Sequence, residues 1–178
     1  MKDLVRRLDP ALDSYLRVSG AVMNGIAMAM FAVMLVANGY NIALRSLADR
    51  GIMWHQEVSL MAAFWIYFGA YSLLAKEDGY IRVEFVVDRL APRLQAWILL
   101  SIHVLVVAFH VILLVLCIVT FRVVSGYETP ILQWPEGIYY VPLAVGTADI
   151  VATEVILLAR LIAFPDRPRP KGAPPLAG

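Results

Sequence analysis

Four ionisable side chains lie inside apolar stretches of this sequence, where a charge is costly, so they are the first candidates for chemistry. His103 and His110 lie seven residues apart in one stretch, and Asp149 and Glu154 lie five apart in the next. Embedded histidine and carboxylate groups can relay protons or cations, and two histidines can ligate haem. The same groups can also bond to one another, or to a partner chain, and stabilise helix packing.

The depth of these groups predicts which of them meet, provided that the two stretches form antiparallel helices. At 1.5 Å per residue, His103 lies about 14 Å and Glu154 about 15 Å from the same side, and His110 and Asp149 lie at about 24 and 22 Å. His103 and His110 share a helix face, whereas Asp149 and Glu154 do not. One histidine–acid contact is therefore easier to form than two. The neighbouring residues are apolar, which favours structural pairing over a continuous relay.

The composition indicates a membrane protein. Of 178 residues, 61% are hydrophobic and 16% are charged, whereas a soluble domain has about half and about a quarter. The net charge of +1 argues against nucleic acid as a partner, because phosphate binding needs a clustered basic face. The single cysteine, Cys117, cannot form an internal disulfide, which excludes disulfide-exchange enzymes. The sequence shows no nucleophile–base pair, phosphate loop or metal-ligand spacing, so we expect neither catalysis nor a cofactor.

Four apolar stretches are bounded by charged residues, and each has roughly the 20 residues that a helix needs to cross a bilayer. They lie at about 18–44, 54–75, 94–121 and 137–164. An alternating pattern, which a membrane barrel requires, is absent from the sequence. We therefore predict an all-α integral membrane protein with one four-helix domain over residues 1–164. The proline-rich segment 165–178 is predicted to be a disordered tail.

Two further segments, about 2–16 and 80–91, have apolar residues at helical spacing and charges on the other face. This pattern is typical of helices that lie on the membrane surface. Of the fifteen lysines and arginines, twelve lie on the side of the two termini and of the loop between the second and third spans. Such an excess marks the cytoplasmic side. We expect both termini in the cytoplasm and the loops 45–57 and 122–136 outside.

The most specific pattern extends from the start of the second span into the following loop. It consists of Trp54, Glu57, Gly69, Ala70, Tyr80, Ile81, Val83 and Glu84, followed by the stop at Ala91-Pro92. This order resembles the small membrane subunit of tripartite ATP-independent periplasmic (TRAP) transporters, the DctQ type. The sequence departs from the family pattern at Gln56, where a second acid is common, and at Tyr80, where histidine is common.

The resemblance implies a non-enzymatic partner subunit in a bacterial inner membrane. In such transporters a large multi-span subunit carries the substrate and sodium sites, and a periplasmic binding protein delivers the substrate, often an organic acid. The small subunit is thought to brace the large one and to help dock the binding protein. We expect these two proteins and membrane lipid as partners. The residues expected to contact the binding protein lie in the two outer loops: Arg45, Arg50, Glu128, Gln133 and Trp134.

Two other functions stay open at this stage. One is a standalone small carrier, coupled to protons or cations through Asp149 and Glu154. The other is a haem-binding membrane anchor that uses His103 or His110.

In the first span, small residues recur at four-residue spacing, which indicates either a close helix contact or no more than ordinary membrane composition: Ala21, Gly25 and Ala29.

Overall fold

The computed structural model describes residues 2–76 and 92–163, and most of these residues are helical. The elements are α1 (Lys2–Ala48), α2 (Trp54–Lys76), α4 (Pro92–Val124), the short 3-10 helix η1 (Glu136–Tyr139) and α5 (Tyr140–Ala163). Each of the four α-helices has a stretch long and apolar enough to cross a membrane. The prediction of an all-helical protein with four candidate spans is therefore confirmed.

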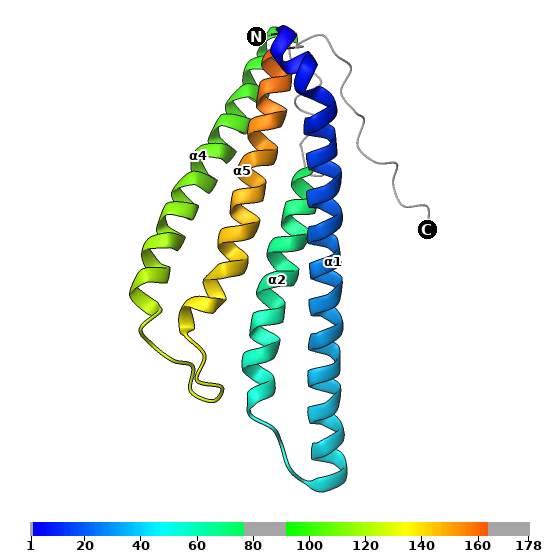
Figure 1. Cartoon of the computed structure of the whole chain (residues 1–178), viewed down its shortest axis with the longest axis vertical. Coiled ribbons are helices and arrows are strands. Elements are labelled where there is room, and N and C mark those ends of the chain that lie inside the picture. The colour runs from blue at the N-terminus through cyan, green and yellow to red at the C-terminus, as the bar shows by residue number, and fades with distance from the viewer. Residues whose placement is uncertain (1, 77–91, 164–178) are drawn as a thin grey trace.

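α1 is one continuous helix of 47 residues, so the segment 2–16 and the first span belong to a single element. Pro10 lies inside it, where a proline removes one backbone hydrogen bond and bends the helix. The first turns lean across the end of α5 (Figure 1). There Arg160 of α5 pairs with Asp9 at 3.1 Å and with Asp13 at 2.7 Å. The N-terminal segment is thus not a separate helix, and its location at a membrane surface stays a prediction.

Three predictions lie outside the described residues. They are the second surface helix at 80–91, the tail at 165–178, and the motif residues Tyr80, Ile81, Val83 and Glu84.

α5 is the central helix of the bundle. It lies against α2 on one side and α4 on the other, and α1 packs along α2 (Figure 1). In the most apolar window of α5, 44% of the residues are buried, whereas the share is 11% in both α1 and α4. Small and polar residues make up much of the buried surface of α5: Gly146, Thr147, Asp149, Thr153 and Glu154. Polar groups in this helix must therefore find partners on the neighbouring helices.

Two glycines allow α2 to approach its neighbours closely. A Cβ at Gly69 would lie 3.1 Å from Ala27 Cβ and from the Met23 carbonyl oxygen of α1. A Cβ at Gly146 of α5 would lie 2.7 Å from Phe68 Cβ of α2. α2 is therefore held between α1 and α5 at backbone distance.

The small residues of α1 do not form this contact. Ala21, Gly25 and Ala29 are exposed, and a Cβ at Gly25 would have nothing within 4 Å in the described part of the chain. α1 meets α2 through Met23 and Ala27, which are buried. The four-residue spacing therefore does not mark a close contact within this chain.

The helices are staggered along the bundle axis. α2 ends at Lys76, which lies beside Asp149 in the middle of α5, whereas α1, α4 and α5 reach further (Figure 1). We call the end of the bundle where α1 begins and α5 ends the terminal side. The opposite end, with the connections 49–53 and 125–135, is called the loop side.

Candidate functional site

Asp149 connects three helices. Its Oδ1 accepts a hydrogen bond from the Tyr15 hydroxyl of α1 at 2.8 Å. Its Oδ2 accepts from the Ser72 hydroxyl and the Lys76 ammonium of α2, and Lys76 also donates to Ser72 Oγ at 2.8 Å. The side chains of Lys76 and Asp149 are each 7% exposed. Both charges are thus compensated inside the bundle, where an unpaired charge would be strongly destabilising.

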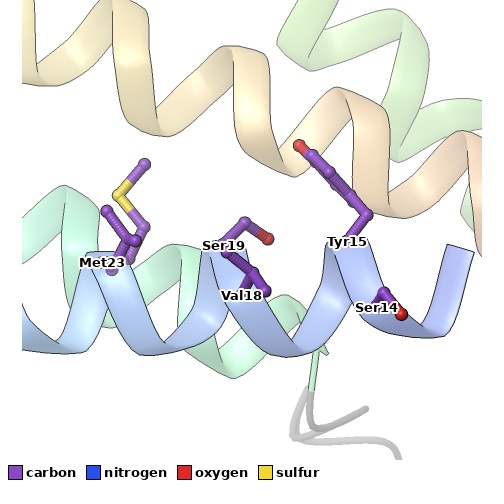
Figure 2. Close-up of a pocket in the computed structure, with 6 residues that line it drawn as sticks. Ser14, Tyr15, Val18, Ser19 and Met23 are labelled. Atoms are coloured by element: carbon purple, nitrogen blue, oxygen red, sulfur yellow. The ribbon is translucent and has the colours of Figure 1, made fainter. Parts of the chain in front are cut away.

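α1 reaches α5 through Tyr15, whose side chain points toward α5 in Figure 2. An open hollow continues along α1 from this contact, lined by Ser14, Tyr15, Val18, Ser19, Val22 and Met23. Figure 1 shows α1 and α5 diverging toward the loop side. The Tyr15–Asp149 hydrogen bond therefore joins the two helices where they are still close together.

Depth counting placed His110 level with Asp149, and the structure pairs Asp149 with Lys76 instead. The count compared only the third and fourth apolar stretches, whereas the partner of Asp149 comes from the second, because α2 ends level with the middle of α5. Lys76 is the last residue of α2. In the sequence, the lysine at this position was the available sign of the Lys76–Asp149 pair, because an embedded acid needs a cation within reach.

The structure brings His103 and Glu154 together, with His103 Nδ1 2.6 Å from Glu154 Oε2. The Glu154 side chain is fully buried and that of His103 is 11% exposed. His110 Nδ1 donates instead to the Val106 carbonyl oxygen at 2.8 Å. The His110 ring stacks on Tyr71 of α2, with 5.7 Å between ring centroids. Both histidines thus attach α4 to its neighbours.

Glu57 holds the loop-side connection between α4 and η1. Its carboxylate oxygens accept hydrogen bonds from the backbone N–H groups of Ile131 and Leu132, each at 2.9 Å. Within the connection, Thr129 Oγ1 accepts from the Trp134 N–H at 3.0 Å. Glu57 is buried, so this motif residue positions a loop and does not itself present a surface.

Asparagine side chains of α1 fix the connection 49–53 and the start of α2 in a similar way. Asn41 Oδ1 accepts from the Ile52 N–H at 2.9 Å, and its Nδ2 lies 3.2 Å from His55 Nε2. Asn38 Nδ2 donates to Ser59 Oγ at 2.9 Å. Both loop-side connections are therefore fastened to the helices by side chains.

The other predicted site residues divide between the surface and the interior. Gly69 is buried against α1, Ala70 is exposed, and Trp54 is half-buried at the start of α2. The five residues expected to contact a binding protein lie on the loop side: Arg45, Arg50, Glu128 and Gln133, which are exposed, and Trp134, which is half-buried. The structure therefore places the exposed members of that set at one end of the bundle.

Comparison with known families decides the identity of the chain. The model of the family described as "Tripartite ATP-independent periplasmic transporters, DctQ component" matches residues 34–164. The match begins within α1, includes the motif of α2, and extends past the end of α5. The chain belongs to the DctQ family. It is therefore a multi-pass membrane component of a TRAP transporter, as the motif order around α2 indicated.

A curated relative of this DctQ component is the uncharacterized protein y4mM of Sinorhizobium fredii (strain NBRC 101917 / NGR234). The two sequences are 23% identical over 141 residues, which is 79% of this chain. The chain spans only a quarter of the length of that relative. Most of the relative therefore lies outside the region of similarity.

Proposed function

We propose that this chain is the non-catalytic small membrane subunit of a TRAP-type secondary transporter. It braces the large transport subunit in the membrane and helps dock the substrate-binding protein during sodium-coupled uptake of an organic acid. Family membership supports a transporter role. The bracing role rests on one observation, which is that the embedded acids are paired within the chain. Asp149 pairs with Lys76, and Glu154 pairs with His103.

These pairs favour a brace over a standalone carrier. A coupling carboxylate has to bind and release its ion in each cycle, whereas Asp149 is shared by an ammonium and two hydroxyl groups from α1 and α2. Opening that cluster would leave a buried charge unpaired, which is strongly destabilising. Haem ligation has weaker support still. His103 and His110 lie on one helix, whereas the two axial ligands of one haem lie on opposite sides of the iron.

The orientation is part of the proposal, with the terminal side in the cytoplasm and the loop side in the periplasm of a bacterial cell. The connections fastened by Glu57 and Asn41 then form the surface that meets the binding protein. Loops that are already ordered lose little conformational entropy when a partner binds. The fastening contacts thus support docking without touching the partner.

Co-purification tests the proposed function. The chain is expressed with its genomic neighbours, extracted in mild detergent, and its companions are identified by mass spectrometry. We expect a large multi-span membrane protein to co-purify, and uptake into liposomes to require that protein together with a binding protein. Transport by this chain alone in liposomes would overturn the proposal in favour of the carrier. A Soret band in the purified chain would favour the haem anchor.

Reversing the charges at Arg50 and Glu128 is expected to lower uptake several-fold without removing the complex from the membrane. Both side chains are exposed on the loop side. Exposed charges of this kind act chiefly on the rate at which partners associate. The variant is Arg50→Glu with Glu128→Lys, and the measurements are substrate uptake and abundance of the complex.

The matched control is Arg50→Lys with Glu128→Asp, which keeps both charges in place and should retain uptake. If the charge-reversed variant transports normally at normal abundance, the binding protein does not dock at these residues.

A further inference from the structure

One face of α2 remains uncovered in the described part of the chain, and it has a regular pattern. Every exposed residue of α2 falls on it, at alternating spacings of four and three: Gln56, Leu60, Ala63, Tyr67, Ala70 and Leu74. We call these six residues the α2 seam. An average period of 3.5 residues is the pattern by which one helix packs lengthwise on another.

The other faces of α2 are already in use. Gly69 meets α1 at backbone distance, and Phe68 and Ser72 meet α5. The α2 seam therefore does not contribute to the core of this chain. Its small residues, Ala63 and Ala70, flank the large Tyr67. This alternation allows a second helix to approach closely beside a projecting side chain.

Tyr67 lies near the middle of α2, about 14 Å from Lys76 at 1.5 Å per residue. It is 63% exposed. Its ring stacks on Tyr71 with 6.3 Å between centroids and meets Phe68 edge-on at 5.0 Å. Its hydroxyl makes no hydrogen bond within the described residues. Since α2 is a membrane span, this donor lies deep in the hydrocarbon, where an unsatisfied polar group is costly.

Asn24 of α1 is exposed as well. It follows Met23, whose carbonyl oxygen would lie 3.1 Å from a Cβ at Gly69, so it lies at nearly the depth of Tyr67. Its amide also needs a polar partner, but it belongs to another helix and is not part of the α2 seam.

We propose that the α2 seam binds one transmembrane helix of the large subunit, and that this helix presents a hydrogen-bond acceptor to the Tyr67 hydroxyl. The inference rests on the proposed function, which supplies a large partner in the same membrane. From Gln56 to Leu74 the seam is about 27 Å long, close to the roughly 30 Å of a bilayer core. A transmembrane helix of the partner matches this length and can supply an acceptor at the depth of the Tyr67 hydroxyl. Lipid acyl chains have no acceptor there.

Photo-crosslinking from the seam tests the assignment in the complete transporter. A benzophenone amino acid replaces Leu60 or Leu74, each of which is a large apolar residue of the seam. The matched control positions are Leu105 of α4, which is 70% exposed, and Leu35 of α1, which is 56% exposed. Adducts are formed in native membranes and identified by mass spectrometry.

We expect adducts with the large subunit from Leu60 and Leu74 and none from Leu105 or Leu35. Adducts with the large subunit from the control positions alone would overturn the seam assignment and leave the proposed function standing. Adducts between two copies of this chain would overturn the choice of partner. If the large subunit neither co-purifies nor crosslinks at any position, the proposed function itself fails.

The Tyr67→Phe variant tests the hydrogen bond, because it keeps the aromatic ring and removes only the hydroxyl. We expect about three- to tenfold more dissociated subunit in detergent, the size of an average to strong interhelical hydrogen bond. Tyr40→Phe is the matched control, since Tyr40 is 53% exposed and lies next to Asn41 at the loop-side end of α1. Equal dissociation of Tyr67→Phe, Tyr40→Phe and the wild type would overturn the proposed hydrogen bond.

Discussion

Replacing Lys76 by methionine is expected to destabilise the chain by about 3–5 kcal/mol, the usual cost of breaking a buried ion pair from one side. Asp149 would keep its place inside the bundle, where its carboxyl group would have only the hydroxyl groups of Tyr15 and Ser72 as partners. Thermal unfolding in mild detergent, followed by tryptophan fluorescence, measures the loss. Methionine has nearly the length of lysine, so the change removes charge more than volume.

A double variant distinguishes the pair from a general effect of substitution. When Asp149→Asn accompanies Lys76→Met, both charges are gone, and most of the lost stability should return, because buried pairs are often replaced by neutral groups at little cost. Arg17→Met controls for removal of a cation on the same side of the bundle. Arg17 is exposed, and surface changes usually stay within about 0.5 kcal/mol. Purely additive losses in the double variant would contradict the pairing.

Gly146→Leu is expected to separate α2 from α5 and to cost about 3 kcal/mol or more, at the upper end of overpacking effects. The new Cβ alone would lie 2.7 Å from Phe68 Cβ and 3.2 Å from the Phe68 carbonyl oxygen. Neither atom lies at the flexible end of a side chain, so the helices themselves must move. Thermal unfolding in detergent again measures the effect, and reduced co-purification of the large subunit should accompany it.

Gly25→Leu is the matched control for this prediction. Gly25 also lies within a spanning helix, but a Cβ there has nothing within 4 Å among the described residues. Exchanging a helix glycine for a better helix former should be neutral or stabilise the chain by up to about 1 kcal/mol. If both leucine variants lose the same stability, α2 and α5 do not approach each other as closely as the structure shows.

The four candidate spans could be predicted because bilayer thickness sets the length of an apolar helix and charged residues mark its ends. The boundary between 2–16 and the first span could not be located in this way. Both segments have helical periodicity, and nothing between Leu16 and Val18 stops a helix, so α1 continues through. Whether a helix continues depends on local residues, whereas its angle to the membrane depends on what it packs against. The ion pairs of Arg160 with Asp9 and Asp13 show such packing.

The candidate site was only partly predictable for a related reason. His103 and Glu154 could be paired by depth because α4 and α5 are neighbours. The same count did not identify the partner of Asp149, because Lys76 lies at the end of α2, a helix that the count did not include. Sequence also could not show which residues of α2 face outward. α2 is apolar on all sides, so its exposed seam becomes visible only when α1 and α5 cover the other faces.

The sequence by itself determined that this chain is a bundle of apolar helices and, through the motif from Trp54 onward, that it belongs with the DctQ components. Both follow from residue types along the chain. Only the tertiary structure decided that Asp149 meets Lys76, that Glu57 fastens a loop, and that Tyr67 faces outward. These contacts depend on the stagger and rotation of helices, which are set where backbones approach at Gly69 and Gly146. Such contacts join residues far apart in the sequence, and no local pattern records them.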